Sequence, residues 1–311
     1  MRERGTRRIW SELYSAPALI QSGALRALAQ RRIDLLFAVG PDQLDDARAV
    51  IEACRHAGVG VGLWPLLDPE RGRWANELTA HAIAPFAEEL FEKLERESLL
   101  PDELAIDLEP PFDLLAERTL RSLGRFAIGN RHEGKERLLG WRAHARARGI
   151  RVVAAVLPTV LADGPRRRWQ RLLATPVDSL DADHVTVMLY TSLIEGYTRG
   201  QLGRADVRAL LAEVARQAST RTGFGLSLGA IATGSLGDEP TYRTPAELAD
   251  DVAIARGLGI EELALFSLCG ALRRPPIEAW LDAFVLTEPG PAPTLTARAR
   301  LVWGAIQLIG R

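Results

Sequence analysis

Lysine is almost missing from this sequence, since Lys93 and Lys135 are the only lysines among its 39 basic residues. Neither falls at the end of a predicted strand, which excludes an enzyme that forms a Schiff base on a strand-end lysine. Histidine is scarce too, and none of the 5 histidines stands at the carboxyl end of a predicted strand. A catalytic zinc or two-metal site would need histidines and carboxylates there, so the sequence predicts no metal site and no cofactor.

Net charge and long apolar runs are equally limited. The net charge is −1 with a pI near 6.6, which gives no indication of a nucleic-acid partner. No apolar stretch reaches the roughly 18 residues that a membrane-spanning helix needs, and no apolar segment of a signal peptide follows the charged start MRERGTRRIW. The sequence therefore predicts a soluble protein without a membrane span, located in the cytoplasm unless an export signal has been removed.

Cysteine gives no sign of a disulfide framework or of nucleophilic catalysis. Cys54 and Cys269 are far apart in the sequence, and we expect both to be buried free thiols. No cysteine and histidine are placed together. Covalent catalysis through a cysteine nucleophile is therefore not predicted.

Short apolar runs recur along the chain, each followed by a longer stretch with helical spacing. They cover residues 7–15, 32–40, 58–67, 103–110, 151–159, 184–192, 223–232 and 262–270. Eight strands that alternate with helices predict a (β/α)8 TIM barrel, an α/β fold, and no linker marks a second domain within residues 1–311. An open doubly wound sheet would need a glycine-rich phosphate turn after an early strand, but VGPDQ follows the second run.

Two helices have clear end signals. The stretch 41–58 is predicted to end at Gly58, and the stretch 244–259 ends in a glycine pair before the last strand. Thr244 and Pro245 are predicted at the N-cap and first helical positions, with Glu247 completing a capping box. The third and fourth connections are the longest, so each has room for an extra helix or a lid.

The stretch DELAIDLEPPF, residues 102–112, places two acids at the end of the fourth predicted strand. Asp107 and Glu109 are two residues apart and therefore face the same side of the strand. Active sites of such barrels lie at the carboxyl ends of the strands. Burying one acid beneath another raises a pKa and holds a proton ready, which suits a general acid acting on a glycosidic oxygen. A pair held by backbone donors or arginines is the structural alternative.

Other strand ends supply further candidates. Glu12 and Tyr14 stand at the end of the first strand, Trp64 ends the third with Asp68 just after it, and Trp74 stands in the loop that follows. Tryptophan and tyrosine rings could stack on sugar rings, although core packing is the common role of such residues. Glu12 and Asp68 are weaker candidates than the Asp107 and Glu109 pair, and either could be the partner of Glu109 in a two-carboxylate mechanism. The alternative role for Glu12 is a structural salt bridge.

DELAIDLE resembles the fourth-strand signature of the family 18 chitinases, in which four acids are spaced Asp-x-x-Asp-x-Asp-x-Glu. Asp102, Asp107 and Glu109 match three of these acids, and Ala105 stands where the remaining acid would be. VMLYT resembles the family's Met-x-Tyr element on the sixth strand, with Met188 and Tyr190 at the two positions. The resemblance implies a TIM barrel, with carbohydrate as the substrate.

The resemblance also implies roles for these residues. Glu109 would protonate the leaving oxygen, and Asp107 would orient the N-acetyl group whose carbonyl oxygen is the nucleophile. Tyr190 would support that acetamido group. The chain departs from the family at Ala105, lacks an aspartate after Tyr190, and has no counterpart in ALFSLCG of the eighth-strand tryptophan that forms the floor of a sugar subsite.

The predicted function is that of a metal-independent glycoside hydrolase. Two alternatives stay open at this point. The first is a barrel that binds carbohydrate without catalysis, because the signature is incomplete. The second is a phosphate-handling lyase or isomerase, because glycines follow the seventh and eighth strands, where barrel enzymes often bind phosphate, and two arginines stand beside them. These residues are Gly229, Gly234, Gly237, Gly270, Arg273 and Arg274.

Overall fold

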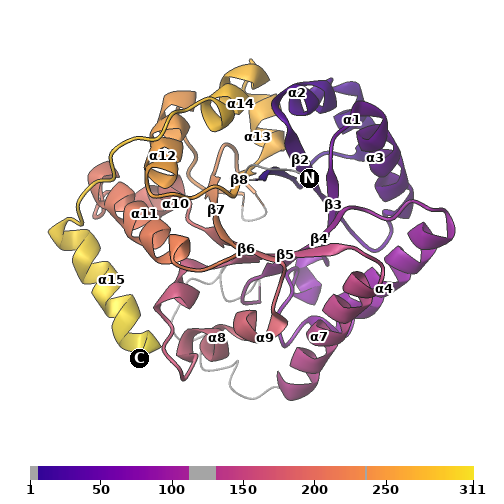
Figure 1. The fold of residues 1–311 in the computed structure, drawn as a ribbon, viewed down its shortest axis with the longest axis horizontal. Helices are drawn as coiled ribbons and strands as arrows, with labels where there is room; N and C mark the ends of the chain where they lie inside the picture. The colour runs from indigo at the N-terminus through magenta and orange to yellow at the C-terminus, as the bar shows by residue number, and fades with distance from the viewer. Residues whose placement is uncertain (1–5, 112–130, 235–236) are drawn as a thin grey trace.

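A computed structural model describes residues 6–111, 131–234 and 237–311 of the chain. Parallel strands pair in the order β1 to β8 and close into a barrel, which confirms the predicted (β/α)8 fold (Figure 1). That residues 1–311 make up one domain stays a prediction. The strands are β1 Arg7–Ser11, β2 Ile33–Val39, β3 Val61–Pro65, β4 Glu103–Leu108, β5 Arg151–Val156, β6 His184–Met188, β7 Phe224–Gly229 and β8 Leu263–Phe266.

The helices form a ring outside the barrel, and the C-terminal helix α15 lies outside that ring beside α11 (Figure 1). The described α-helices are α1 Ala16–Gln21, α2 Ala24–Arg31, α3 Leu44–Ala57, α4 Ala80–Arg96, α7 Arg131–Ala147, α8 Arg168–Leu173, α9 Val177–Leu180, α10 Thr191–Tyr197, α11 Arg204–Ser219, α12 Pro245–Gly257, α13 Leu268–Arg273, α14 Ile277–Val285 and α15 Ala297–Gly310. The described 3-10 helices are η1 Pro69–Arg71 and η3 Pro158–Ala162.

The predicted helix ends are confirmed in position but not in every contact. Gly58 ends α3 with φ of 72°, a left-handed conformation that glycine adopts without steric cost. Helix α12 begins at Pro245 as predicted, but the Thr244 side chain makes no cap hydrogen bond. The predicted capping box is therefore wrong. The Glu247 carboxylate accepts instead from the backbone N–H and the side chain of Arg243, the residue before the N-cap Thr244.

The last predicted strand, 262–270, is too long. Strand β8 stops at Phe266 because the Ser267 side chain accepts a hydrogen bond from the backbone N of Gly270 and starts helix α13. Cys269 thus lies in a helix, and both it and Cys54 are buried free thiols. The third connection contains η1 and the long helix α4, whereas the extra element expected in the fourth falls largely on residues 112–130, outside the described residues.

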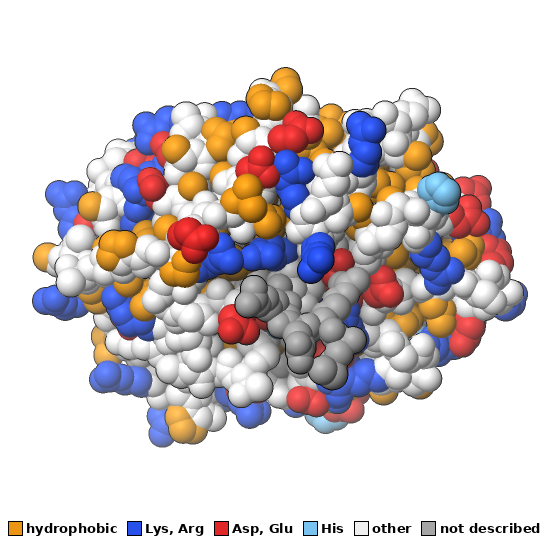
Figure 2. Space-filling model, turned by 45° about the horizontal axis from the view of Figure 1, so that its top comes forward, with side chains coloured by type: hydrophobic (Ala, Val, Ile, Leu, Met, Phe, Trp, Pro, Cys, Tyr) orange, Lys and Arg blue, Asp and Glu red, His pale blue; other side chains and the backbone are white. Residues whose placement is uncertain are grey.

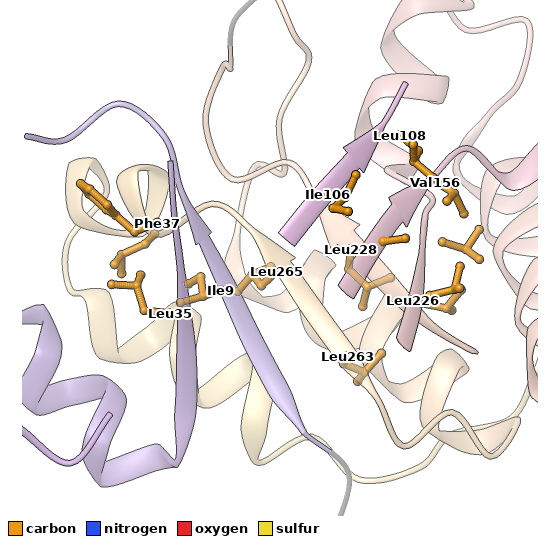
Figure 3. Close-up of a cluster of buried hydrophobic side chains, with 14 of the residues drawn as sticks. Ile9, Leu35, Phe37, Ile106, Leu108, Val156, Leu226, Leu228, Leu263 and Leu265 are labelled. Atoms are coloured by element: carbon orange, nitrogen blue, oxygen red, sulfur yellow. The ribbon is translucent and has the colours of Figure 1, made fainter. Parts of the chain in front are cut away.

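Strand side chains alternate between two apolar layers. One layer packs with the helices, and Figure 3 shows part of it on β1, β2, β4, β5, β7 and β8 through residues such as Ile9, Leu35 and Leu228. The other layer is a separate cluster inside the barrel. Its strand residues are Trp10, Leu36, Ala38, Trp64, Ala105, Ala155 and Ala264, with Met188 and Phe266 packed against them.

The amino end of the barrel is closed by an ionic cluster on inward-facing positions. Arg8 on β1 donates from Nε and Nη2 to the Glu103 carboxylate on β4, at 2.8 and 3.0 Å, and from Nη1 to Glu262 at 2.8 Å. Arg151 adds a second ion pair to Glu103 at 2.7 Å. Burial, together with the Arg8 charge, lowers the pKa of His184 beside them to about 4, so this imidazole is neutral. The carboxylates of Glu103 and Glu262 at this end of the barrel are therefore paired with arginine side chains.

The surface carries both signs of charge. On the face in Figure 2, basic and acidic side chains are interspersed with apolar ones. Large exposed apolar side chains include Leu301, Leu308 and Ile309 on α15. Within the described ranges, no helix combines the length and the apolar character that crossing a membrane requires.

Replacing Arg8 with methionine should lower the free energy of unfolding by about 3 kcal/mol, because Glu103 is only 2 % exposed and would be buried with part of its charge unmatched. Denaturant unfolding at neutral pH measures this. The matched control is Arg137→Met, which breaks an exposed ion pair with Glu133 one helical turn away and should cost less than about 1 kcal/mol. Equal effects of the two substitutions would show that the cluster at the barrel end does not stabilise the fold.

Candidate active site

A cavity of about 400 Å³ opens among the carboxyl ends of the strands, a size typical of small-molecule sites. Residues at or just after the ends of most strands line it, which is the expected position in this fold. Its lining includes seven of the nine predicted site residues: Glu12, Trp64, Trp74, Asp107, Glu109, Met188 and Tyr190.

Asp107 and Glu109 lie together in this cavity, as their spacing predicts. Asp107 is 5 % exposed, Glu109 is half-buried, and each carboxyl group influences the pKa of the other. Among the described residues, the Oδ1 atom of Asp107 has no hydrogen-bond partner. Burial, with the Glu12 charge adding to it, raises the pKa of Glu109 from 4.5 to about 7. Burial and the neighbouring charges of Glu109 and Glu12 raise the pKa of Asp107 as well.

Glu12 lies at the cavity but is engaged in an ion pair. Its carboxylate accepts from Nη2 of Arg73, which follows the turn after η1, and its side chain is only 3 % exposed. This is the salt-bridged arrangement that the sequence left open as an alternative. The Glu12 charge nevertheless acts on the site, because it raises the pKa values of both strand β4 acids.

Aromatic rings form much of the cavity wall. Trp10 and Trp64 meet edge to face, with ring centroids 4.9 Å apart, and Tyr190 stacks on Phe266 at 5.8 Å. Trp10, Trp64 and Trp74 also belong to the inner apolar cluster and expose at most 6 % of their surface. Core packing and lining of the cavity are therefore combined in the same tryptophans.

The segment that carries Trp74 is fixed to the end of β4. The backbone N of Ala75 donates to the Asp107 carbonyl at 2.9 Å, and the Asn76 side chain donates to the Glu109 carbonyl at 3.1 Å. Thr79 Oγ1 donates to the Trp74 carbonyl at 2.5 Å. The acid pair and the Trp74 wall are thereby joined by direct hydrogen bonds.

Tyr190 and Met188 lie where β6 ends. The Tyr190 hydroxyl shares a 3.2 Å hydrogen bond with Ser227 Oγ on β7, and burial raises its pKa. Gly229 permits the stack of Tyr190 on Phe266, because a Cβ there would lie 3.2 Å from the Tyr190 ring and 2.9 Å from the Phe266 carbonyl oxygen. The Tyr190 hydroxyl is thus held close to the acid pair as a neutral group.

Two predicted site residues lie elsewhere. Asp68 is exposed at the start of η1, where its carbonyl accepts from the backbone of Arg71 and Arg73, and it is not among the described residues of the cavity lining. Tyr14 is half-buried against the outer core, with the Arg273 guanidinium 6.0 Å from its ring centre. Both lie away from the cavity lining because the chain leaves the strands earlier than expected, at Ser11 and at Pro65.

Trp10, Phe266 and Glu239 are among the lining residues that were not predicted as part of the site. Trp10 could have been found, because it stands two positions before Glu12 and therefore faces the same way. Phe266 ends β8 in the cavity lining, on the strand where the sequence showed no counterpart of the chitinase tryptophan. Glu239 lies in the loop after β7, and no periodicity predicts that a loop folds back over the barrel mouth.

The arginines considered for a phosphate site are otherwise engaged. Arg274 donates to the backbone carbonyls of Ile231, Tyr242 and Arg243, and its guanidinium lies over the Trp280 ring. Arg273 lies over the Tyr14 ring, and neither arginine lines the cavity. In the part of the chain that the structure describes, no group of three or more His, Cys, Asp or Glu side chains is arranged to hold a metal ion.

Because Glu109 has a raised pKa, its contribution to stability should be complete below pH 4.5 and be lost as the pH rises through about 7. The full loss corresponds to about 3 kcal/mol. Glu109→Gln carries no titrating group there, so its free energy of unfolding should fall less than that of the wild type between pH 4.5 and 8. Denaturant unfolding across this range, with the exposed Glu288→Gln as the control, measures the difference. Parallel curves for wild type and Glu109→Gln would contradict the raised pKa.

Comparisons with known proteins place the fold. No protein-family model matches the chain, and no curated protein sequence matches it significantly. Among solved structures, the glycoside hydrolase domain of PgaB (BpsB) from Bordetella bronchiseptica is similar with a TM-score of 0.54 and 14 % identity, over 91 % of this chain and 99 % of that chain.

Two chitinases are similar to the same degree. Chitinase catalytic domain 2 of Ostrinia furnacalis gives a TM-score of 0.54 at 13 % identity, over 94 % of this chain and 100 % of that one. The class V chitinase from Nicotiana tobaccum gives 0.51 at 13 %, over 90 % and 99 %. Structures of a D-allulose 3-epimerase and a 3-dehydroquinate dehydratase also match, each with a TM-score of 0.45. In fold, the chain resembles chitinase-like TIM barrels at low sequence identity.

Proposed function

We propose that the protein is a glycoside hydrolase in which Glu109 donates a proton to the glycosidic oxygen. The observation that carries this proposal is the acid pair of Asp107 and Glu109, buried at the barrel mouth among aromatic rings. A general acid works best with a pKa near the working pH, and burial raises the pKa of Glu109 to about 7. Glycoside hydrolases among the structural neighbours make this chemistry compatible with the fold.

Asp107 acts as the helper of Glu109 in this proposal. It lies one inward position below Glu109 on β4, and its raised pKa means that it holds a proton more readily than an ordinary aspartate. A protonated Asp107 donates a hydrogen bond to Glu109 and, once substrate is bound, to an acetamido group. Tyr190, whose hydroxyl is neutral and held by Ser227, supports the same group.

The nucleophile in this proposal is the carbonyl oxygen of a substrate N-acetyl group. Supporting this choice, the Glu12 carboxylate is engaged by Arg73, and Asp68 lies outside the cavity lining. Trp64 and Trp74 contribute ring surface for the apolar face of a sugar, and Met188 fills the wall beneath Tyr190. Glu12 then serves by its charge, which raises the pKa of the general acid.

A carbohydrate-binding protein without catalysis is the second candidate, and one observation favours it. Ala105, fully buried beneath Asp107, stands where the chitinase signature has another acid. The Oδ1 atom of Asp107 consequently has no hydrogen-bond partner among the described residues. A protein of this kind would keep its affinity for sugar when Glu109 is replaced, and would show no turnover in either form.

Replacing Glu109 with glutamine should reduce turnover of aryl glycosides or chitin oligomers by about a hundredfold or more, the effect expected when a general acid is lost. Wild type, Glu109→Gln and the exposed control Glu288→Gln are assayed side by side on a panel that includes N-acetylated sugars. Turnover restricted to sugars without an acetamido group would retain the hydrolase and rule out the substrate as nucleophile. An active wild type with an equally active Glu109→Gln would remove Glu109 as the acid.

The rate on the best substrate should fall as the pH rises above about 7, because Glu109 then loses the proton it has to donate. Glu12→Gln removes a negative charge that raises this pKa, so the alkaline limb of kcat should move to lower pH while activity persists below it. The pH profile of kcat for wild type and variant measures the shift. Complete loss of activity at every pH in Glu12→Gln would instead identify Glu12 as the nucleophile.

A further inference from the structure

The C-terminal helix α15 has an apolar face on each side. On its inner side Ala299 and Trp303 are buried, and the Ile306 carbonyl accepts a hydrogen bond from Trp169 Nε1 at 2.8 Å. A helix on the surface of a protein normally carries polar side chains on its outer face. The outer face of α15 instead carries small or apolar residues three or four positions apart, all exposed: Ala297, Leu301, Gly304, Ala305 and Leu308.

The leucines on this outer face project well away from the domain. Leu301 is 75 % exposed and Leu308 is 70 % exposed, and with Ile309 they make up three of the six large apolar side chains that are exposed among the described residues. A Cβ built on Gly304, between the two leucines, would meet no atom of the described chain within 4 Å. Exposed apolar side chains that gather in one place usually mark a surface that binds a partner.

Arginine is concentrated in the same region. Residues 164–173, with the sequence GPRRRWQRLL and here named the arginine segment, contain four arginines and no acidic residue. Helix α15 and the residue after it, 297–311, contain three more arginines and no acidic residue. Seven positive charges therefore fall in two short segments of a chain whose net charge is only −1.

Direct contacts join the arginine segment to the end of α15. The backbone N of Gly164 donates to the Gly310 carbonyl at 3.0 Å, and Trp169 makes its bond to Ile306 one turn earlier. Figure 1 shows the end of α15 beside α8, which the arginine segment includes. The exposed Leu308 and Ile309 belong to this same last turn of α15, so apolar and basic side chains adjoin.

Most of the charge in the arginine segment is not neutralised by the protein. Arg167 pairs with Asp178 at 2.8 Å. By contrast, Arg166, Arg168 and Arg171 are exposed, and none of them takes part in an ion pair found within the described ranges. Exposed guanidinium groups without an acidic neighbour attract anions, and phosphate suits their planar, forked geometry best.

We propose that the outer face of α15 and the arginine segment together dock on the surface of a membrane that contains anionic lipids. The leucines enter the boundary between head groups and acyl chains, and the arginines contact the lipid phosphates and acidic head groups. Docking of this kind needs an apolar and a basic contribution together, and here both occur side by side. The helix lies on one leaflet and does not cross it.

Charge and apolar character together favour this occupant over the others that such a face could bind. A second copy of the chain would bring the same arginine segment against its own kind, and like charges would oppose the contact. A nucleic acid would match the arginines but would leave Leu301 and Leu308 exposed to water. The inference is independent of the proposed hydrolase, because no residue of the cavity takes part in it.

Vesicle binding by the whole chain tests the inference. Vesicles of phosphatidylcholine alone, and vesicles that also contain about 30 mol % phosphatidylserine, are titrated at low ionic strength, and the bound fraction is measured by flotation. The variants are the double substitution Arg166→Gln with Arg168→Gln and the single substitution Leu308→Gln. Their matched controls are Arg26→Gln with Arg32→Gln, exposed on and just after α2 and away from α15 (Figure 1), and the exposed Leu286→Gln.

The wild type should bind the phosphatidylserine vesicles at least about tenfold more tightly than phosphatidylcholine vesicles. The double arginine variant should weaken this binding by about tenfold or more, because each arginine near an anionic surface contributes about fivefold. Leu308→Gln should weaken it by about threefold or more, since an apolar side chain no longer enters the lipid. Each control should change it by less than about twofold.

Several results would overturn the inference. These are no binding to phosphatidylserine vesicles, equal affinity for both kinds of vesicle, or controls that weaken binding as much as the variants. Binding that needs the arginines but is unchanged in Leu308→Gln would identify a purely electrostatic surface and would favour a polyanion such as nucleic acid. A dimer in sedimentation experiments without lipid, lost in Leu308→Gln, would assign the face to a second copy of the chain.

Discussion

Every second side chain of each strand points into the closed interior of the barrel. This alternation decides which side chains meet at each level between the amino end and the carboxyl end of the barrel. On β4 the inward positions are Glu103, Ala105 and Asp107, which stand level with Arg151, Val153 and Ala155 of β5, and Glu109 follows just beyond the strand end. Apolar side chains fill the middle level, and carboxyl groups occupy both ends. A buried carboxyl group is stable only with a cation beside it or a proton on it, and the two ends use these two solutions.

Glu103 and Glu109 show both solutions on a single strand. Glu103 is almost fully buried, and both Arg8 and Arg151 contact its carboxylate directly. Glu109 lies among aromatic rings with Asp107 as its neighbour, so burial raises its pKa to about 7. The difference follows from the side chains that neighbouring strands place beside each acid. At the amino end of the barrel the neighbour is an arginine, and at the carboxyl end it is tryptophan or alanine. At the carboxyl end, none of the ion pairs found among the described residues involves Asp107 or Glu109, and the nearby Arg73 pairs with Glu12 instead.

The sequence was sufficient to predict what depends on local periodicity. Eight apolar runs predicted the eight strands, and the spacing of Asp107 and Glu109 placed both at the barrel mouth. Positions just beyond a strand end were less predictable. Tyr14 and Asp68 follow β1 and β3 by only three residues, but each strand had already given way to a turn. The position of Glu239 could not be predicted at all. It depends on contacts of its loop with Gly196 and Asp251, which lie in helices and are not specified by the sequence of the loop itself.

The hydrogen bonds from Ala75 and Asn76 to the backbone of Asp107 and Glu109 extend the sheet by a short piece of chain from another connection. Glu109 itself lies beyond the last residue of β4, where a backbone normally gains freedom. Here its carbonyl is held from outside the strand, so the backbone that carries the Glu109 side chain is fixed in place. Less backbone conformational entropy then remains to be lost when a ligand binds, and the backbones of Glu109 and Trp74 keep a constant spacing, as in preorganised sites.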